Sequence, residues 1–220
     1  MPDVLVDNDV VIKSISYGFT DEMLSLLQSH DLSPAILAVS HFMISNKMKR
    51  LKSFLLREVA LAELSQILGL FNPIEPNEAE LALAAEFEDA ARTLNLELDS
   101  GESQLFAILL QRALRLMLTG DKRAIRAIEA IAGSKFDVPA VACLEQLIIS
   151  LVGEIGVGNL RSIICSEKAV DKTLAICFRC SMPDFDPQPI MQGLASYASD
   201  VRRSAPRAVI ASDGLFDLVP

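Results

Sequence analysis

The chain of 220 residues is poor in aromatic residues and in long apolar runs. It has no tryptophan, two tyrosines and ten phenylalanines, so its core must consist mainly of leucine, isoleucine, valine and alanine. No uninterrupted apolar run reaches the ~18 residues of a membrane-spanning helix. The Met-Pro-Asp start has neither the basic nor the apolar region of a secretory signal, so we expect a cytoplasmic location.

Cysteine and histidine are also scarce, with four and two residues. So few cysteines are typical of a reducing compartment, in which buried thiols pack as small apolar groups. One C-x-x-C spacing is present, but it has no second pair, and both histidines lie far upstream in the sequence. We therefore expect packing rather than zinc or redox chemistry for Cys143, Cys165, Cys177 and Cys180.

Apolar residues, by contrast, are abundant. They make up 51% of the chain, and the mean hydropathy is +0.35, more than one solvated domain of this size requires. Apolar surface in excess of the core has to be covered by a second copy of the chain or by a partner. The composition therefore favours a homo-oligomer or a protein that binds a partner protein.

The net charge of −9 argues against a general nucleic-acid binder, which would carry a basic face. The charge is uneven, because residues 75–102 hold nine acidic residues and only one basic residue. Basic residues gather instead in two short segments. These segments form either the rim of a site for a phosphate-bearing substrate or ordinary solvated helix faces. They contain Lys47, Lys49, Arg50, Lys52 and Arg57, and Lys122, Arg123 and Arg126.

Two acidic residues flank a predicted helix and strand in LDSGESQLFAILLQRALRLMLTGDKRAI, residues 98–125. Ser100 is the expected N-cap, with Glu102 in the first helical turn. The apolar run from Leu116 to Leu118 predicts a short buried strand that ends before Asp121. A helix and the strand that follows it run in opposite directions. Glu102 and Asp121 are therefore expected at the same edge of the sheet.

The N-terminus supplies a third acidic residue. The run Val4-Leu5-Val6 predicts a first parallel strand, which delivers Asp7 to its carboxyl end. Ligands bind outside the carboxyl ends of the strands in open α/β sheets. Three clustered carboxylates repel one another unless a cation joins them, and Mg²⁺ and Mn²⁺ prefer carboxylate oxygens.

The segments V-L-V-D-N-D-V-V-I, L-D-S-G-E-S and L-M-L-T-G-D-K-R-A together resemble a PIN domain. The resemblance covers residues 3–150. It implies a PIN-like three-layer α/β/α fold with a central, mainly parallel sheet. PIN domains include many metal-dependent ribonucleases, among them the toxins of bacterial toxin–antitoxin pairs. The resemblance therefore implies RNA as the substrate and allows an antitoxin as a protein partner.

By position in this resemblance, Asp7, Glu102 and Asp121 are the catalytic carboxylates and hold Mg²⁺ or Mn²⁺. The bound ion activates water against an RNA phosphodiester bond. Asp9 and Asp99 are further candidates close to the site.

Another acidic residue usually follows the first strand–helix unit of the family. Here the corresponding positions are Val39, Ser40 and His41, none of them acidic. Glu58 and Glu63 are the alternatives within the chain. We also expect Thr119 to orient a water molecule or a ligand carboxylate from behind the site.

Residues 1–150 are expected to form the PIN-like domain, and residues 151–220 a helical C-terminal extension packed on it. The proline-containing tail is predicted to consist of loops and short helices. Helices are predicted over 20–29, from Pro34 onward, over 48–70, 78–94, 122–132 and 160–180, and strands at 4–6, 116–118 and within 138–143.

Two other functions are open. A PIN-like interaction module without catalysis fits the missing acidic residue and the apolar surplus. A receiver domain of the response-regulator type also uses acidic residues at strand ends, but in an order that this chain lacks. Each acidic residue also has a structural explanation, since Asp7 and Asp121 can cap helices and Glu102 can stabilise a helix dipole.

Overall fold

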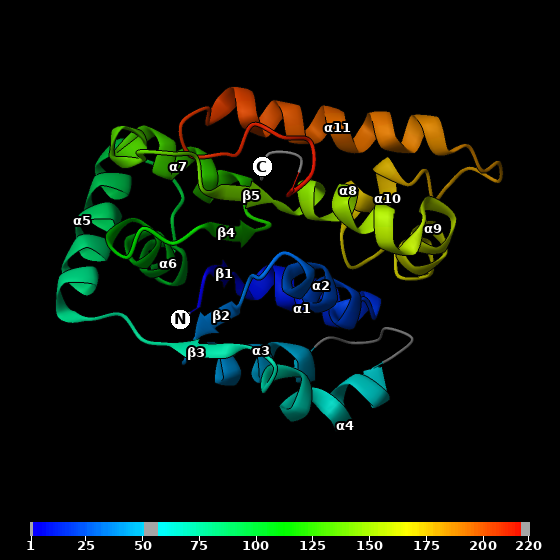
Figure 1. Cartoon of the computed structure of the whole chain (residues 1–220), viewed down its shortest axis with the longest axis horizontal. Helices are drawn as coiled ribbons and strands as arrows, with labels where there is room; N and C mark the ends of the chain where they lie inside the picture. The colour runs from blue at the N-terminus through cyan, green and yellow to red at the C-terminus, as the bar shows by residue number, and fades with distance from the viewer. Residues whose placement is uncertain (1, 51–56, 217–220) are drawn as a thin grey trace.

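The computed structural model describes residues 2–50 and 57–216. Its centre is a sheet of five parallel strands in the order β3-β2-β1-β4-β5, with helices on both faces (Figure 1). The predicted α/β class with a central parallel sheet is confirmed, and the arrangement is consistent with three layers. The strands are β1 (Val4–Val6), β2 (Pro34–Leu37), β3 (Asn72–Ile74), β4 (Leu116–Thr119) and β5 (Val141–Cys143).

The central strands are short, and all of their buried residues except Thr119 are apolar because both faces of the sheet are covered. Every residue of β1, β4 and β5 is buried. In β1, Val4 and Val6 pack into one core and Leu5 packs into the other. The parallel register pairs Val6 with Leu118, so Asp7 follows β1 directly beside the end of β4.

No helix in the described ranges combines the length and apolar character needed to span a bilayer. The helices divide between the two cores. One core contains residues of α1 (Asn8–Tyr17), α2 (Thr20–Ser29), α3 (Ser40–Arg50), α4 (Arg57–Leu68), α8 (Leu144–Ile155), α9 (Val157–Ser166) and α10 (Lys172–Cys177). The other contains residues of α5 (Glu78–Leu94), α6 (Ser100–Gln111) and α7 (Lys122–Ala132), which continues into the 3₁₀ turn η1 (Gly133–Lys135); α11 (Pro187–Ser204) contributes to both.

The predicted helices at 20–29, 78–94 and 122–132 are confirmed because their ends carry clear signals. In α5, the Asn77 side chain accepts a hydrogen bond from the Glu80 amide at 2.9 Å, and Glu80 accepts one from the Asn77 amide at 2.8 Å. This capping box satisfies two amides that a helix start leaves without partners. The helix ends at Asn95, whose φ of 54° is left-handed.

Two predictions near the first core are wrong. Pro34 begins the strand β2 rather than a helix, and the helix starts only at Ser40. No strand is predicted directly after the helix over 48–70, but Asn72 and Pro73 begin β3 at the sheet edge, where a proline removes no central ladder hydrogen bond. The helix predicted over 48–70 overlaps the end of α3 and the whole of α4. Its positions 51–56 lie outside the described residues.

The C-terminal part also differs from the prediction. Residues 160–180 contain two helices, α9 and α10, rather than one. The tail forms the 18-residue helix α11 instead of loops and short helices. Pro187 is its first residue, a position that needs no amide donor, and Asp186 caps it by accepting from the Gln188 amide at 3.0 Å.

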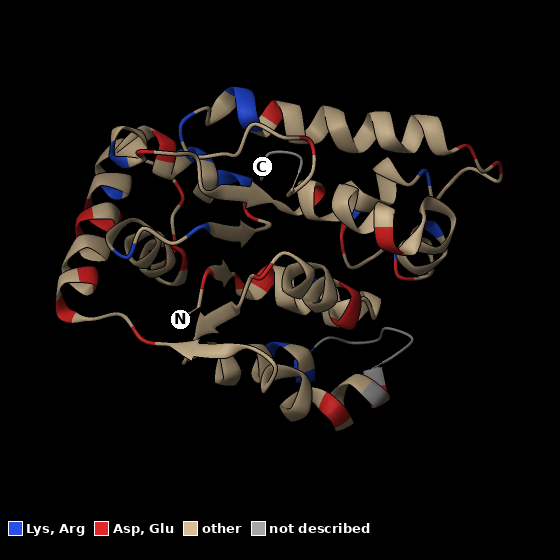
Figure 2. Ribbon diagram, viewed as in Figure 1, with Lys and Arg blue, Asp and Glu red and all other residues tan. Residues whose placement is uncertain are grey.

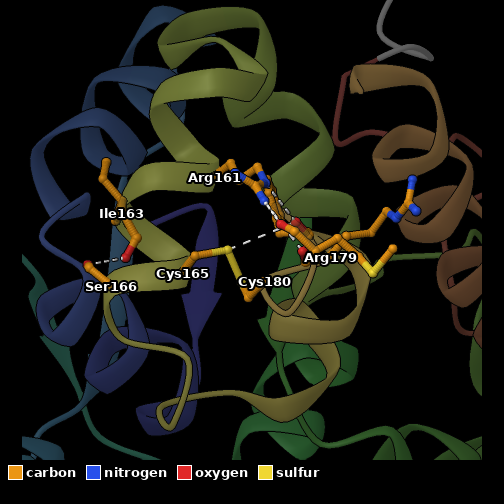
Figure 3. Close-up of a disulfide and its surroundings, with 8 residues drawn as sticks. Arg161, Ile163, Cys165, Ser166, Arg179 and Cys180 are labelled. Carbon is orange, nitrogen blue, oxygen red and sulfur yellow. Dashed lines mark hydrogen bonds between the residues drawn. A yellow bond between two sulfur atoms is a disulfide. The ribbon is translucent and has the colours of Figure 1, made fainter. Parts of the chain in front are cut away.

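The expectation that all four cysteines are packed thiols is wrong for two of them. Cys165 on α9 and Cys180 after α10 form a disulfide with a Cα–Cα distance of 5.0 Å (Figure 3). Cys143 and Cys177 are buried free thiols, so the C-x-x-C spacing does not mark a bonded pair. The disulfide ties the segment after α10 to α9.

Breaking this bond should destabilise the fold. The loop that it closes spans 15 residues, for which the entropy model gives about 3 kcal/mol of stabilisation. We expect a reductant to lower the free energy of unfolding by this order, measured by urea denaturation. The double variant Cys165→Ser/Cys180→Ser should match the reduced protein and show no response to the reductant. Equal stability of the oxidised and reduced protein would contradict this assignment.

Candidate functional site

Asp7 lies at the carboxyl end of β1, where the chain turns into α1. Its amide donates to the Leu118 carbonyl at 2.9 Å, which fixes it beside β4. The residue occupies the N-cap position of α1, but its side chain makes no capping hydrogen bond. Only 8% of Asp7 is exposed. Hydrogen bonds from the backbone of Asn8 and Asp9 act to lower the pKa of its carboxylate, but they do not offset the effect of burial.

Thr119 connects Asp7 with Asp121. The Thr119 hydroxyl donates to Asp7 Oδ2 at 3.3 Å and accepts from the Asp121 amide at 3.1 Å. Thr119 is fully buried at the end of β4, so its hydroxyl is held in place. Thr119 thus contacts the candidate carboxylate Asp7, while its role in orienting a ligand carboxylate stays a prediction.

Asp121 follows β4 and is the N-cap of α7, as its position predicted. Its Oδ1 accepts from the Arg123 amide at 2.8 Å and from the Ala124 amide at 3.3 Å. Its Oδ2 lies 2.8 Å from Arg123 Nη2 in an ion pair. Both carboxylate oxygens therefore have partners within the first turn of α7.

Glu102 lies in the first turn of α6, but the predicted N-cap Ser100 is wrong by one residue. Asp99 is the N-cap, and its Oδ1 accepts from the Glu102 amide at 2.8 Å. Glu102 Oε2 accepts in return from the Asp99 amide at 3.0 Å. This capping box holds Glu102 with only 7% of the residue exposed.

Three further charged residues stand beside this cluster, and two of them were missed by the sequence reasoning. Lys13 on α1 forms ion pairs with Asp9 and with Asp171, each at 2.6 Å. Asp171 belongs to the C-terminal helices, so no local sequence signal could reveal the pairing. A Cβ at Gly120 would stand 2.2 Å from Asp9 Oδ2, so the β4–α7 turn packs directly on this pair and any larger residue there would displace the Asp9 carboxylate.

The electrostatics separate the candidate carboxylates into two classes. Burial, reinforced by the charges of Asp9 and Asp99, raises the pKa of Asp7 to about 6. Burial, reinforced by Asp99, Asp121 and Asp7, raises the pKa of Glu102 to about 8. For Asp121 burial acts in the same direction, but hydrogen bonds from Arg123 and Ala124 outweigh it and lower the pKa.

The three predicted site residues are thus brought within electrostatic reach of one another, but they do not converge on a single point. Within the described ranges, no three acidic, histidine or cysteine side chains are close enough to hold one metal ion. The engaged oxygens explain this, since Asp121 faces Arg123 and Glu102 faces the Asp99 amide. Their chemistry fits a hard divalent cation, whose binding would require Asp121 to exchange Arg123 for the ion.

The further acidic residue that the resemblance leads us to expect is absent from positions 39–41. Ser40 begins α3 and is buried, while Val39 is exposed and His41 is half-buried. Glu58 and Glu63 lie exposed on α4, and neither contributes to the raised pKa of Asp7. The additional acidic residues that do act on Asp7 are Asp9 and Asp99, the two nearby candidates.

The basic residues after Asp121 do not form a free rim. Arg123 pairs with Glu97 as well as with Asp121, and Arg126 pairs with Asp200 at 2.9 Å. The Lys122 ammonium pairs with Glu145, a buried acidic residue in the first turn of α8. The other basic segment lies in the last turn of α3, well apart from the acidic residues of α5 (Figure 2), with Lys52 and the side chain of Arg57 outside the described residues.

Comparison of the chain with known protein families, with curated proteins and with solved structures finds no match. The chemistry of the site therefore has to be inferred from its own residues.

The raised pKa of Glu102 predicts that Glu102→Gln stabilises the protein. In the folded state Glu102 binds its proton more tightly than in the unfolded state, so its contribution to stability is present at low pH and lost as the pH rises through about 8. We expect a gain on the order of 3 kcal/mol at about pH 8.5 that disappears near about pH 4.5, measured by urea denaturation.

Glu80→Gln is the matched control, because Glu80 holds the same place in the capping box of α5. Hydrogen bonds from Arg112 lower the pKa of Glu80, so this substitution should destabilise the protein at neutral pH. A loss of stability in both variants at about pH 8.5 would contradict the assignment for Glu102.

Proposed function

We propose that the chain is a metal-dependent ribonuclease of the PIN type, which hydrolyses RNA phosphodiester bonds. One observation carries the proposal: two buried carboxylates, Asp7 where the parallel strand β1 ends and Glu102 in the first turn of α6, form no ion pair within the described residues. Burying acidic groups without a cation destabilises a fold, and such groups concentrate at functional sites.

In this proposal Asp7, Glu102 and Asp121 hold Mg²⁺ or Mn²⁺. The bound ion would polarise the phosphate and lower the pKa of the attacking water. Thr119 keeps the Asp7 carboxylate oriented through its hydroxyl, and the capping box of α6 keeps Glu102 at the site. Asp9 and Asp99 add negative charge that favours a cation at this end of the sheet.

The experiment is cleavage of labelled single-stranded RNA with Mn²⁺ or Mg²⁺, with and without EDTA. We expect cleavage that requires the metal and that falls by more than about 100-fold in Asp7→Asn and Asp121→Asn, because removing even a residue that only supports a ligand costs 10- to 100-fold. Asp137→Asn, at an exposed position after η1, is the control and should cleave normally. Metal-independent cleavage, or full activity in Asp7→Asn, would refute the proposal.

A second candidate function is a PIN-like interaction module that binds a second copy of the chain or a partner protein such as an antitoxin. Val39, Phe42 and Met43 favour it, because they are 56%, 68% and 53% exposed and lie three and four residues apart, on one side of the start of α3. Large apolar side chains grouped in this way mark interaction sites.

If this surface joins two copies, Phe42→Asp should convert an oligomer into a monomer, measured by light scattering on a size-exclusion column. Leu94→Asp is the control, because Leu94 is 55% exposed on the distant end of α5 and should leave the oligomer intact. A monomeric wild-type protein would rule out self-association and leave a separate partner as the occupant.

We place the proposed activity in the cytoplasm, where RNA substrates are found. The disulfide between Cys165 and Cys180 weighs against this location, because cytosolic thiol systems keep most cysteines reduced.

A further inference from the structure

The cations next to the carboxylates offer little net positive charge to a polyanionic substrate. Lys122, Arg123 and Arg126 are all engaged with acidic residues. An RNA chain nevertheless needs positive groups along its backbone, since phosphate contacts supply most of the affinity of such complexes. The described chain carries free cations elsewhere, at one hollow on the C-terminal helices.

This hollow has a volume of about 470 Å³ and lies along α10 and the segment after it. The size is within the range of small-molecule and nucleotide sites. Lys168, Lys172 and Arg179 line it, and no acidic residue of the described chain forms an ion pair with any of them. Ile176 and Met182, 65% and 45% exposed, add apolar surface between these cations.

The wall of the hollow is held in place by two interactions (Figure 3). Arg161 on α9 donates to the Phe178 carbonyl at 3.2 Å and to the Met182 carbonyl at 2.7 Å. The disulfide from Cys165 fixes Cys180, which also lines the hollow. Arg179 lies within this fixed segment, and its side chain extends away from the disulfide. Arg179 is therefore carried by a segment that these two interactions hold in place.

The hollow is also linked to the carboxylate cluster. Asp171, directly before Lys172, caps α10 by accepting from the Leu174 amide at 2.9 Å. The same carboxylate pairs with Lys13, which pairs with Asp9 two residues after Asp7. Lys13 thereby offsets part of the negative charge of Asp171, which is adjacent to Lys172 in the sequence. Of the acidic residues around the hollow, Glu167 flanks Lys168, and Asp184 and Asp186 follow Met182.

We propose that Lys168, Lys172 and Arg179 form the backbone-binding surface for a single-stranded RNA whose scissile phosphate lies at the carboxylates. This inference rests on the proposed function and gives the C-terminal helices a part in it. The cations would bind successive phosphates, while Ile176 and Met182 contact a base. Charge complementarity favours this occupant, because the surface is cationic on a chain of net charge −9.

The test is the affinity for a fluorescently labelled single-stranded RNA, measured by anisotropy in EDTA so that the probe stays intact. In Lys168→Gln/Lys172→Gln/Arg179→Gln, we expect Kd to rise at least about tenfold. The slope of log affinity against log salt should become shallower by about 2, because each phosphate contact to a single strand contributes about 0.7. Arg92→Gln/Lys135→Gln/Arg203→Gln removes the same charge from exposed positions elsewhere and should bind as the wild type does.

Lys168→Arg/Lys172→Arg keeps the charges and should retain binding, which separates loss of charge from loss of structure. Equal affinity of the two triple variants, or no RNA binding by the wild type, would overturn the inference. Wild-type protein that binds RNA through these cations but cleaves none would overturn the proposed function alone. Cleavage that needs Asp7, with affinity unchanged in the first triple variant, would overturn this inference alone.

Discussion

The parallel pairing of β1 with β4 is the constraint on which the candidate site depends. It joins the Asp7 amide to the Leu118 carbonyl and so places the Asp7 side chain against the buried Thr119 hydroxyl. Because helices cover both faces of the sheet, the carboxylate at this strand end is shielded from water. The fold thereby forces a charge-bearing group into a desolvated position, which is destabilising unless a ligand compensates for it.

The chain pairs its other buried acidic residues with cations. Glu80 meets Arg112 and Glu145 meets Lys122, while the partly buried Asp171 meets Lys13. Asp7 and Glu102 depart from this pattern, and their pKa values are raised accordingly. Buried carboxylates without an ion pair are expected mainly at functional sites, because proteins depart from favourable charge pairing mainly where function requires it.

The elements that the sequence predicts correctly are those with strong local signals. Asn77 and Glu80 mark the start of α5, and Asp121 marks that of α7. Pro34 favours a helix start in the sequence, and only the pairing of its segment with β1 and β3 makes it the strand β2. Long-range features could not be predicted: cysteine spacing does not specify which residues bond, and no pattern links Lys13 with Asp171 across the chain.

The candidate site was predictable as a set of positions but not as a geometry. Asp7, Glu102 and Asp121 lie at the expected edge, yet the orientation of Asp121 toward Arg123 depends on side-chain packing.

The most direct test of the central claim is calorimetric titration of Mn²⁺ into the wild type, Asp7→Asn and Asp137→Asn near neutral pH. The account predicts binding by the wild type and by Asp137→Asn that is lost in Asp7→Asn. No binding by the wild type, or equal binding by all three proteins, would contradict it.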